Sequence, residues 1–245
     1  MRFFHDKISA GVKQNSVTIM SMLPACSDLI TLQLGKEIHC YAMRMGFESK
    51  VEVQNALLGM YVRFGSIENA HRVFDRISPK NVVSWTTLIS GYIEDGQSDI
   101  ALKLFRHMQV TGMILDSVTI STVIPVCSHM VALGHGKEIH GYSIRSGLGF
   151  NDFVESALIY MYAKCGSIEN ACLMFDRVSK GDINAWNAMI AGYGMHGHGG
   201  DSIALIDKMQ VTGFIPNHIT FTTLLSACSH TGLVDEGWKF VYCMI

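Results

Sequence analysis

Residues 65–70 are GSIENA, and the same six residues return at 166–171, 101 positions further along the chain. Three other segments repeat at the same distance: SVTI at 16 and 117, KEIH at 36 and 137, and MQVTG at 108 and 209. When residues 16–81 are aligned with 117–182 without a gap, 31 of the 66 positions are identical. A fixed period is the sequence signature of a repeat architecture, so this period decides the fold.

The 101-residue period divides into units of 35, 31 and 35 residues, and each unit has a helical pattern. In residues 82–116, Trp85, Leu88 and Tyr92 lie three or four positions apart, and a second apolar stripe follows Gly96. This spacing is typical of amphipathic helices and predicts helices over 83–95 and 98–111. One glycine recurs just past the second helix, where a left-handed residue ends a helix: Gly46, Gly112, Gly147 and Gly213.

A helix hairpin of this size cannot bury its apolar face alone, so neighbouring hairpins must stack. We therefore predict an all-α fold, a right-handed α-solenoid. The 245 residues are 49% hydrophobic and 16% charged, which is too apolar for a disordered chain. The formal net charge of −2 argues against a broad basic surface for indiscriminate phosphate binding. Two stretches without charged residues, 117–136 and 209–234, are each interrupted by a proline. We therefore expect no membrane span.

The repeat pattern xxxWNxxIxGYxxxGxxxxALxLFxxMxxxGxxPx resembles that of pentatricopeptide repeats, and the rotation of 35-, 35- and 31-residue units is similar to the plant PLS subclass. The resemblance covers nearly the whole chain. It places L repeats at 16–50 and 117–151, S repeats at 51–81 and 152–182, and P repeats at 82–116 and 183–217. Residues 1–15 match a partial P repeat and 218–245 a partial L repeat, so we expect a piece of a longer chain.

The resemblance also implies which residues recognise RNA. In this family each repeat recognises one nucleotide through its fifth and last residues. Carried over by position, the pairs are Asn55 with Asn81, Thr86 with Asp116, Ser121 with Asn151, Ser156 with Asp182, and Asn187 with Asn217. Amides and hydroxyls can reach the edge of a single-stranded base, and a carboxylate accepts the imino proton of G or U. Met20 with Lys50 departs from the pattern.

The second residue of each repeat packs against the base in this family. Apolar side chains suited to stacking occupy five of these positions: Val17, Val83, Val118, Phe153 and Ile219. Glu52 and Asn184 depart from this pattern. A purely structural interpretation competes with base recognition, because Ser, Thr and Asn cap helix starts and Asp or Asn form turns. Composition alone does not separate the two; the resemblance favours recognition.

Other sites are disfavoured by the sequence. Gly192, Gly194 and Gly197 match a dinucleotide-binding fingerprint in letters, but a helix instead of a strand is predicted before them. His196 and His198 have no metal-ligand partner at a suitable spacing, and His39 and His140 are expected to pack between helices. Cys26, Cys127 and Cys228 share one repeat position and are expected in the core, with all seven cysteines as free thiols.

Neither the H-x-E nor the P-C-x-x-C motif of a zinc deaminase occurs in the sequence. We therefore expect no catalysis, cofactor or metal in this chain. The expected function is sequence-specific binding of single-stranded RNA, not DNA, as a specificity factor for RNA processing such as C-to-U editing in a mitochondrion or chloroplast, with RNA-editing co-factor proteins as further partners. The alternative is a peptide-binding scaffold of the tetratricopeptide type, although those repeats have 34 residues and a different signature.

Overall fold

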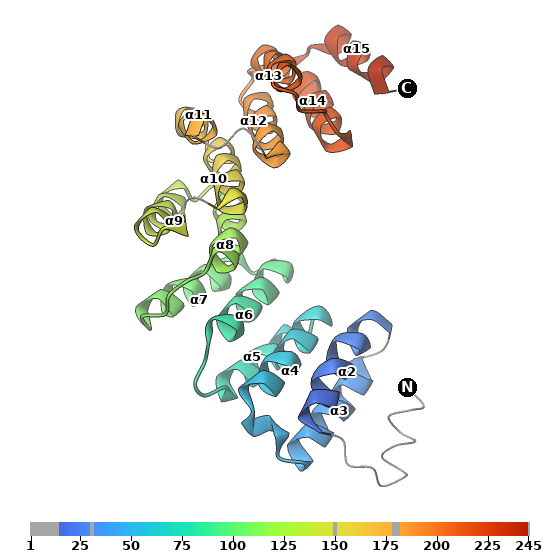
Figure 1. Cartoon of the computed structure of the whole chain (residues 1–245), viewed down its shortest axis with the longest axis vertical. Helices are drawn as coiled ribbons and strands as arrows, with labels where there is room; N and C mark the ends of the chain where they lie inside the picture. The colour runs from blue at the N-terminus through green and yellow to red at the C-terminus, as the bar shows by residue number, and fades with distance from the viewer. Residues whose placement is uncertain (1–14, 30–31, 149–150, 178–181, 245) are drawn as a thin grey trace. The chain divides into compact units, whose positions relative to one another are not determined.

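The computed structural model describes residues 15–29, 32–148, 151–177 and 182–244, and this part of the chain contains helices and turns but no strand (Figure 1). Two compact units divide the chain, at 1–115 and 116–245. The first contains α2 (Ser16–Leu29), α3 (Leu32–Arg44), the short 3-10 helix η1 (Phe47–Ser49), α4 (Val51–Arg63), α5 (Ile67–Arg76), α6 (Val82–Glu94) and α7 (Ser98–Val110). The second contains α8 (Ser117–His129), α9 (Leu133–Arg145), α10 (Asp152–Lys164), α11 (Ile168–Arg177), α12 (Ile183–Met195), α13 (Gly199–Val211), α14 (His218–Thr231) and α15 (Val234–Met244).

Consecutive helices form hairpins, and within each unit the hairpins stack. Within each unit the first helices of the hairpins form a row. In the first unit α2 packs against α4 and α4 against α6; in the second unit α8, α10, α12 and α14 pack in succession. Second helices contact the first helix of the next hairpin, as α5 contacts α6 and α11 contacts α12. The predicted all-α solenoid of helix pairs is therefore confirmed. The helices predicted over 83–95 and 98–111 are α6 and α7, each within one residue at both ends.

The unit lengths in the sequence follow from the second helices. α5 and α11, which lie in the 31-residue segments, have 10 residues each, whereas α7, α9 and α13 have 13. The shorter spacing therefore reflects mainly a shortened second helix. The four glycines predicted to end second helices all have left-handed backbone angles, with φ of 71° at Gly46, 76° at Gly112, 72° at Gly147 and 90° at Gly213.

The core repeats between the units as the sequence does. Trp85 packs edge-to-face on Phe74 with ring centroids 4.8 Å apart, and Trp186 packs on Phe175 at 4.9 Å. Both indoles are almost fully buried. Edge-to-face rings add attraction to the area that they bury, so each pair anchors a first helix to the second helix of the preceding hairpin.

The predicted core cysteines are confirmed where their side chains are described. Cys127 and Cys228 are buried, and burial raises the pKa of the Cys127 thiol to about 12. Free thiols are also found at Cys40, Cys165 and Cys172, as at Cys127 and Cys228. The side chains of Cys26 and Cys243 lie outside the described part. Within that part, no helix combines the length and the apolar character that crossing a bilayer requires.

Hydrogen bonds between histidine and tyrosine join successive hairpins. His39 Nδ1 lies 2.9 Å from the Tyr61 hydroxyl, and His140 Nδ1 lies 2.7 Å from the Tyr162 hydroxyl. Each bond runs from a second helix to the first helix of the next hairpin. His39 and His140 therefore pack between helices, as predicted. Burial lowers the pKa of both imidazoles below the usual 6.5, because a half-buried site disfavours the charged ring.

These two histidines are expected to make the fold sensitive to acid. Because the folded chain binds their protons less readily than the unfolded chain does, stability is complete above about pH 6.5 and falls as the pH drops through the lowered folded-state pKa values. Replacing both His39 and His140 by Gln should flatten the decrease in melting temperature between pH 7 and pH 5. Equal slopes for the two proteins would contradict this assignment.

Candidate functional site

Five of the unit-ending residues, those in the sequence-predicted pairs, cap the first helix of the next hairpin, whereas Lys50 before α4 makes no side-chain capping bond. In all five cases the side-chain oxygen accepts a hydrogen bond from a backbone N–H of the first turn. The caps are Asn81 on α6, Asp116 on α8, Asn151 on α10, Asp182 on α12 and Asn217 on α14. These five residues therefore cap helices, as the structural interpretation predicts. Capping engages one oxygen of each side chain, so a second polar atom remains for another partner.

Capping determines the orientation of the amides of Asn81 and Asn217. Because a backbone N–H can only donate, the oxygen of each amide must face the helix: Ser84 N lies 3.0 Å from Asn81 Oδ1, and Thr220 N lies 3.0 Å from Asn217 Oδ1. The hydroxyls of Ser84 and Thr220 donate to the same oxygens at 2.9 and 3.1 Å. The nitrogen of each amide therefore faces away from its helix as a donor.

Two of the five sequence-predicted pairs are directly bonded. Asn55 Nδ2 donates to Asn81 Oδ1 at 3.3 Å, which leaves the buried Asn55 Oδ1 without a hydrogen-bond partner. The Ser156 hydroxyl donates to Asp182 Oδ2, while Asp182 Oδ1 accepts from the backbone and side-chain nitrogens of Asn184. The fold thus brings a fifth residue and a last residue together in both pairs, although they are 26 positions apart in sequence.

Asn187 has the most unusual environment among the predicted residues. Its side chain is 7% exposed on α12, yet neither Oδ1 nor Nδ2 has a hydrogen-bond partner. Leaving a buried polar group unsatisfied costs about 1–3 kcal/mol, and such groups in folded proteins call for an explanation. Its predicted partner Asn217, at the start of α14, also has an Nδ2 without a hydrogen bond among the described residues.

Among the described residues, no hydrogen bond joins Ser121 to Asn151. The Ser121 hydroxyl donates to the Val118 carbonyl of its own helix at 3.1 Å. Thr86 lies in the first compact unit and Asp116 at the start of the second. Asp116 Oδ1 accepts from the Thr119 amide and hydroxyl at 2.8 and 2.6 Å. Both capping bonds use Oδ1, which leaves Oδ2 available.

The second residues of the first helices form a repeated exposed position. Large apolar side chains here are between 46% and 74% exposed, at the same position of successive repeats. These side chains are Val17, Val83, Val118, Phe153 and Ile219. Each stands within three residues of a helix cap, so an exposed apolar surface lies beside a polar edge at each of these helix starts.

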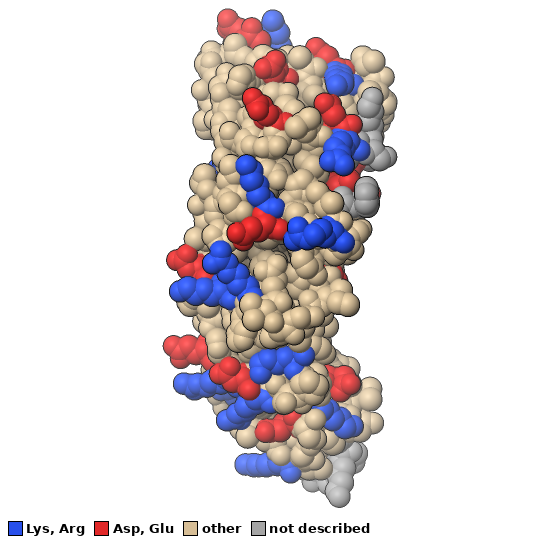
Figure 2. All heavy atoms as spheres, turned by 90° about the vertical axis from the view of Figure 1, so that its left-hand side faces the viewer, with Lys and Arg blue, Asp and Glu red and all other residues tan. Residues whose placement is uncertain are grey.

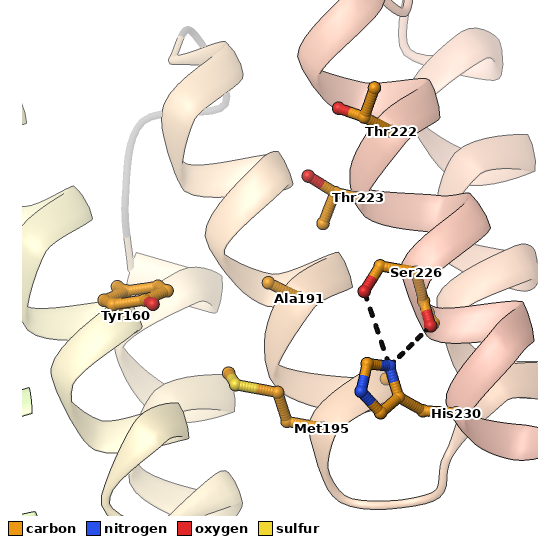
Figure 3. A pocket seen from close by; sticks show the side chains of 9 residues that line it. Tyr160, Ala191, Met195, Thr222, Thr223, Ser226 and His230 are labelled. Atoms are coloured by element: carbon orange, nitrogen blue, oxygen red, sulfur yellow. Dashed lines mark hydrogen bonds between the residues drawn. The ribbon is translucent and has the colours of Figure 1, made fainter. Parts of the chain in front are cut away.

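A hollow between α12 and α14 was not predicted from the sequence. It has a volume of about 360 Å³ and lies along the row of first helices, with Tyr160 of α10 on its far wall (Figure 3). Thr222, at the fifth position of the partial repeat, lies at one end and His230 at the other. The signal available in the sequence was Gly194, which stands where the aligned unit has Ile93.

Charge does not single out another site. Lys and Arg side chains are interspersed with Asp and Glu over the face shown in Figure 2. Among the residues that the structure describes, no three His, Cys, Asp or Glu side chains converge as metal ligands. Gly192 and Gly194 lie inside α12, so the dinucleotide fingerprint lacks its preceding strand, as expected.

Comparison with known proteins identifies the repeats. The model of the PPR repeat family matches residues 80–129 and 181–230, and the PPR repeat model matches 55–78, 156–183 and 219–245. A putative pentatricopeptide repeat-containing protein of Arabidopsis thaliana is 40% identical over 244 residues, which cover 100% of this chain and 34% of that protein. A chloroplastic pentatricopeptide repeat-containing protein of the same plant is 37% identical over 247 residues, with 96% and 28% covered.

The crystal structure of the maize pentatricopeptide repeat protein PPR10 aligns with a TM-score of 0.45 at 21% identity, covering 94% of this chain and 44% of that one. The chain spans about a third of the length of the curated relatives it matches. The family models fall on the stacked hairpins and on the repeated sequence that builds them. The chain belongs to the pentatricopeptide repeat family.

Proposed function

We propose that the chain binds single-stranded RNA and recognises one nucleotide per repeat through the side chains at the starts of the first helices. The observation that carries this proposal is the Asn187 amide, which is buried and unsatisfied at the position where the family places a base-recognition residue. A base edge supplies both a donor and an acceptor, so it would satisfy Oδ1 and Nδ2 together once the buried side chain turns toward the base. The exposed second residues would then stack on base faces.

The hydrogen-bond patterns of two pairs limit the bases that they could recognise. Asn55 offers an acceptor, Oδ1, and Asn81 offers a donor, Nδ2; this combination fits the mixed edge of a pyrimidine or of adenine, and the family resemblance favours the pyrimidine. The Ser156 hydroxyl donates its proton to Asp182, so the Ser156–Asp182 pair offers only acceptors to a base. Guanine presents two adjacent donors, its imino and amino groups, and is the matching base. The proposed register for the six complete repeats is n-Y-G-(A)-G-Y from the 5′ end, where Y is a pyrimidine and the L-repeat base in parentheses is weak.

The proposal extends to subclass and setting. The repeat boundaries at 16–50, 51–81, 82–116, 117–151, 152–182 and 183–217, with partial repeats at 1–15 and 218–245, are those of a PLS array, and the short α5 and α11 support the S assignment. Within a longer protein this array would act as the specificity factor of organellar RNA processing, such as C-to-U editing, with co-factor proteins and without catalysis of its own. The name of the chloroplastic relative supports an organellar location.

The substitution Asn187→Leu distinguishes a role of Asn187 in base recognition from a role in stabilising the fold. Leucine has a similar size and removes the unsatisfied amide, so the variant should be at least as stable as the wild type. It should bind a selected RNA about 5- to 150-fold more weakly, which corresponds to about 1–3 kcal/mol for a bidentate base contact. The measurement is affinity for RNA selected from a random single-stranded pool, alongside thermal unfolding.

The matched control is Asn170→Ala, because Asn170 lies on the second helix α11 and bonds to Ser167. This variant should bind RNA as the wild type does. Failure of the wild-type chain to enrich any RNA from the pool would reject RNA binding. Equal affinities of the wild type and Asn187→Leu would show that the orphan amide has no part in binding.

A further inference from the structure

Close packing of two first helices creates the hollow between α12 and α14. Gly194 of α12 faces Ala227 of α14, and a Cβ placed on Gly194 would lie 2.4 Å from the Ala227 Cβ. No other residue fits there without moving a helix. Small residues therefore form the floor of the hollow, which stays open. Ser226 stands on the rim of the hollow, at the position where the aligned L repeat has Pro125.

His230 presents a hydrogen-bond acceptor to this hollow. Its Nδ1 lies 2.7 Å from the Ser226 carbonyl oxygen, which can only accept, so Nδ1 carries the proton in the neutral ring. Nε2 is then left with a lone pair. Figure 3 shows this second nitrogen on the side of the ring that faces Met195, across the hollow. The exposed imidazole needs no conformational change to receive a donor.

Hydroxyl groups complete the rim. Thr223 projects its hydroxyl toward α12 in Figure 3, and no hydrogen bond engages it among the described residues. No Lys, Arg, Asp or Glu lines the hollow. The lining thus offers neutral donors and acceptors above an apolar floor, which suits a neutral polyhydroxyl group better than a phosphate.

We propose that this hollow is a ribose site, which holds the sugar of the nucleotide whose base faces Thr222. The inference rests on the proposed RNA binding. Thr222 and His230 are eight residues apart on α14, about 12 Å along the helix axis, so a nucleotide whose base contacts Thr222 could place its sugar in the hollow beside His230. The 2′-hydroxyl donates to His230 Nε2, and the Thr223 hydroxyl contacts the sugar. RNA is thereby distinguished from DNA at this nucleotide.

The test is a scan of single 2′-deoxy substitutions along the RNA selected by the wild-type chain. At the nucleotide immediately 3′ of the pyrimidine assigned to repeat 183–217, loss of the 2′-hydroxyl should weaken binding about two- to tenfold, as for one hydrogen bond. In His230→Phe this penalty should disappear, because the ring keeps its shape and loses its acceptor. Thr223→Val, which keeps the size of the side chain, should reduce the penalty in part.

The matched control is His129→Phe, the aligned residue of α8, which should keep the full penalty at that nucleotide. A penalty of unchanged size in His230→Phe, or no sensitive nucleotide in the wild type, overturns the ribose site while leaving RNA recognition intact. Failure of the wild type to bind the all-ribose RNA contradicts the proposed function instead.

Discussion

Replacing Trp186 by alanine is expected to lower the free energy of unfolding by about 3–5 kcal/mol, the usual cost of deleting a buried large aromatic side chain. The indole is 2% exposed and packs edge-to-face on Phe175, and its ring centroid lies 6.0 Å from that of Phe214. Truncation would remove these contacts together and leave a cavity between α11 and α12. Repeats depend on their neighbours, so the loss should appear in the unfolding of the second unit.

Urea denaturation followed by circular dichroism measures this effect. Trp238→Ala is the matched control, because Trp238 is 57% exposed on α15 and its truncation should cost less than about 1 kcal/mol. Similar losses for the two variants would mean that Trp186 does not anchor the stacked hairpins.

Asp116→Asn is expected to shift the preferred base at the third nucleotide of the proposed register from G to A by about 1–3 kcal/mol. Asp116 Oδ1 serves the helix cap, so Oδ2 is the atom that would contact the base in the proposed register. In asparagine this second atom becomes an amide nitrogen, because the oxygen stays with the Thr119 N–H. A donor then replaces an acceptor, which opposes the guanine imino proton and suits the unprotonated N1 of adenine.

Folding should be nearly unaffected by this substitution, since Asn and Asp cap helices about equally well. Removal of one negative charge should raise affinity for every RNA by a similar factor, because that effect acts through phosphates and not through bases. The ratio of affinities for G-site and A-site RNA at one salt concentration is therefore the relevant quantity. An unchanged ratio would show that Asp116 serves only as a cap.

The fold could be predicted from the sequence because the information is repeated. Apolar spacing around Trp85 and the glycine at position 112 each recur in the other unit, and both describe contacts within one hairpin or between neighbours. The capping role of Asn81 and its equivalents could also be predicted, because Asn and Asp are typical helix caps. Capping does not exclude the proposed recognition, because the capping bonds of Asn81 and Asn217 use the amide oxygen and leave the amide nitrogen as a donor.

Other features depend on packing between residues distant in sequence, so no local pattern predicts them. The burial of Asn187 without a partner depends on how its side chain sits among neighbouring helices. The Ser121 hydroxyl bonds back to its own helix, although its position in the repeat matches that of Ser156. The hollow needs the close approach of Gly194 to Ala227, and a glycine in a helix does not show by itself which residue it will meet.

In the proposed mode of RNA binding, each repeat recognises its own nucleotide through the pair at the helix start. This mode is tested most directly by measuring the affinities of the wild type, Asp116→Asn and Asp182→Asn for RNAs that carry G or A at the third or the fifth nucleotide of the register. We expect Asp116→Asn to reverse the preference at the third nucleotide alone and Asp182→Asn to do so at the fifth alone. Preferences that stay the same, or that change at both nucleotides in either variant, would contradict it.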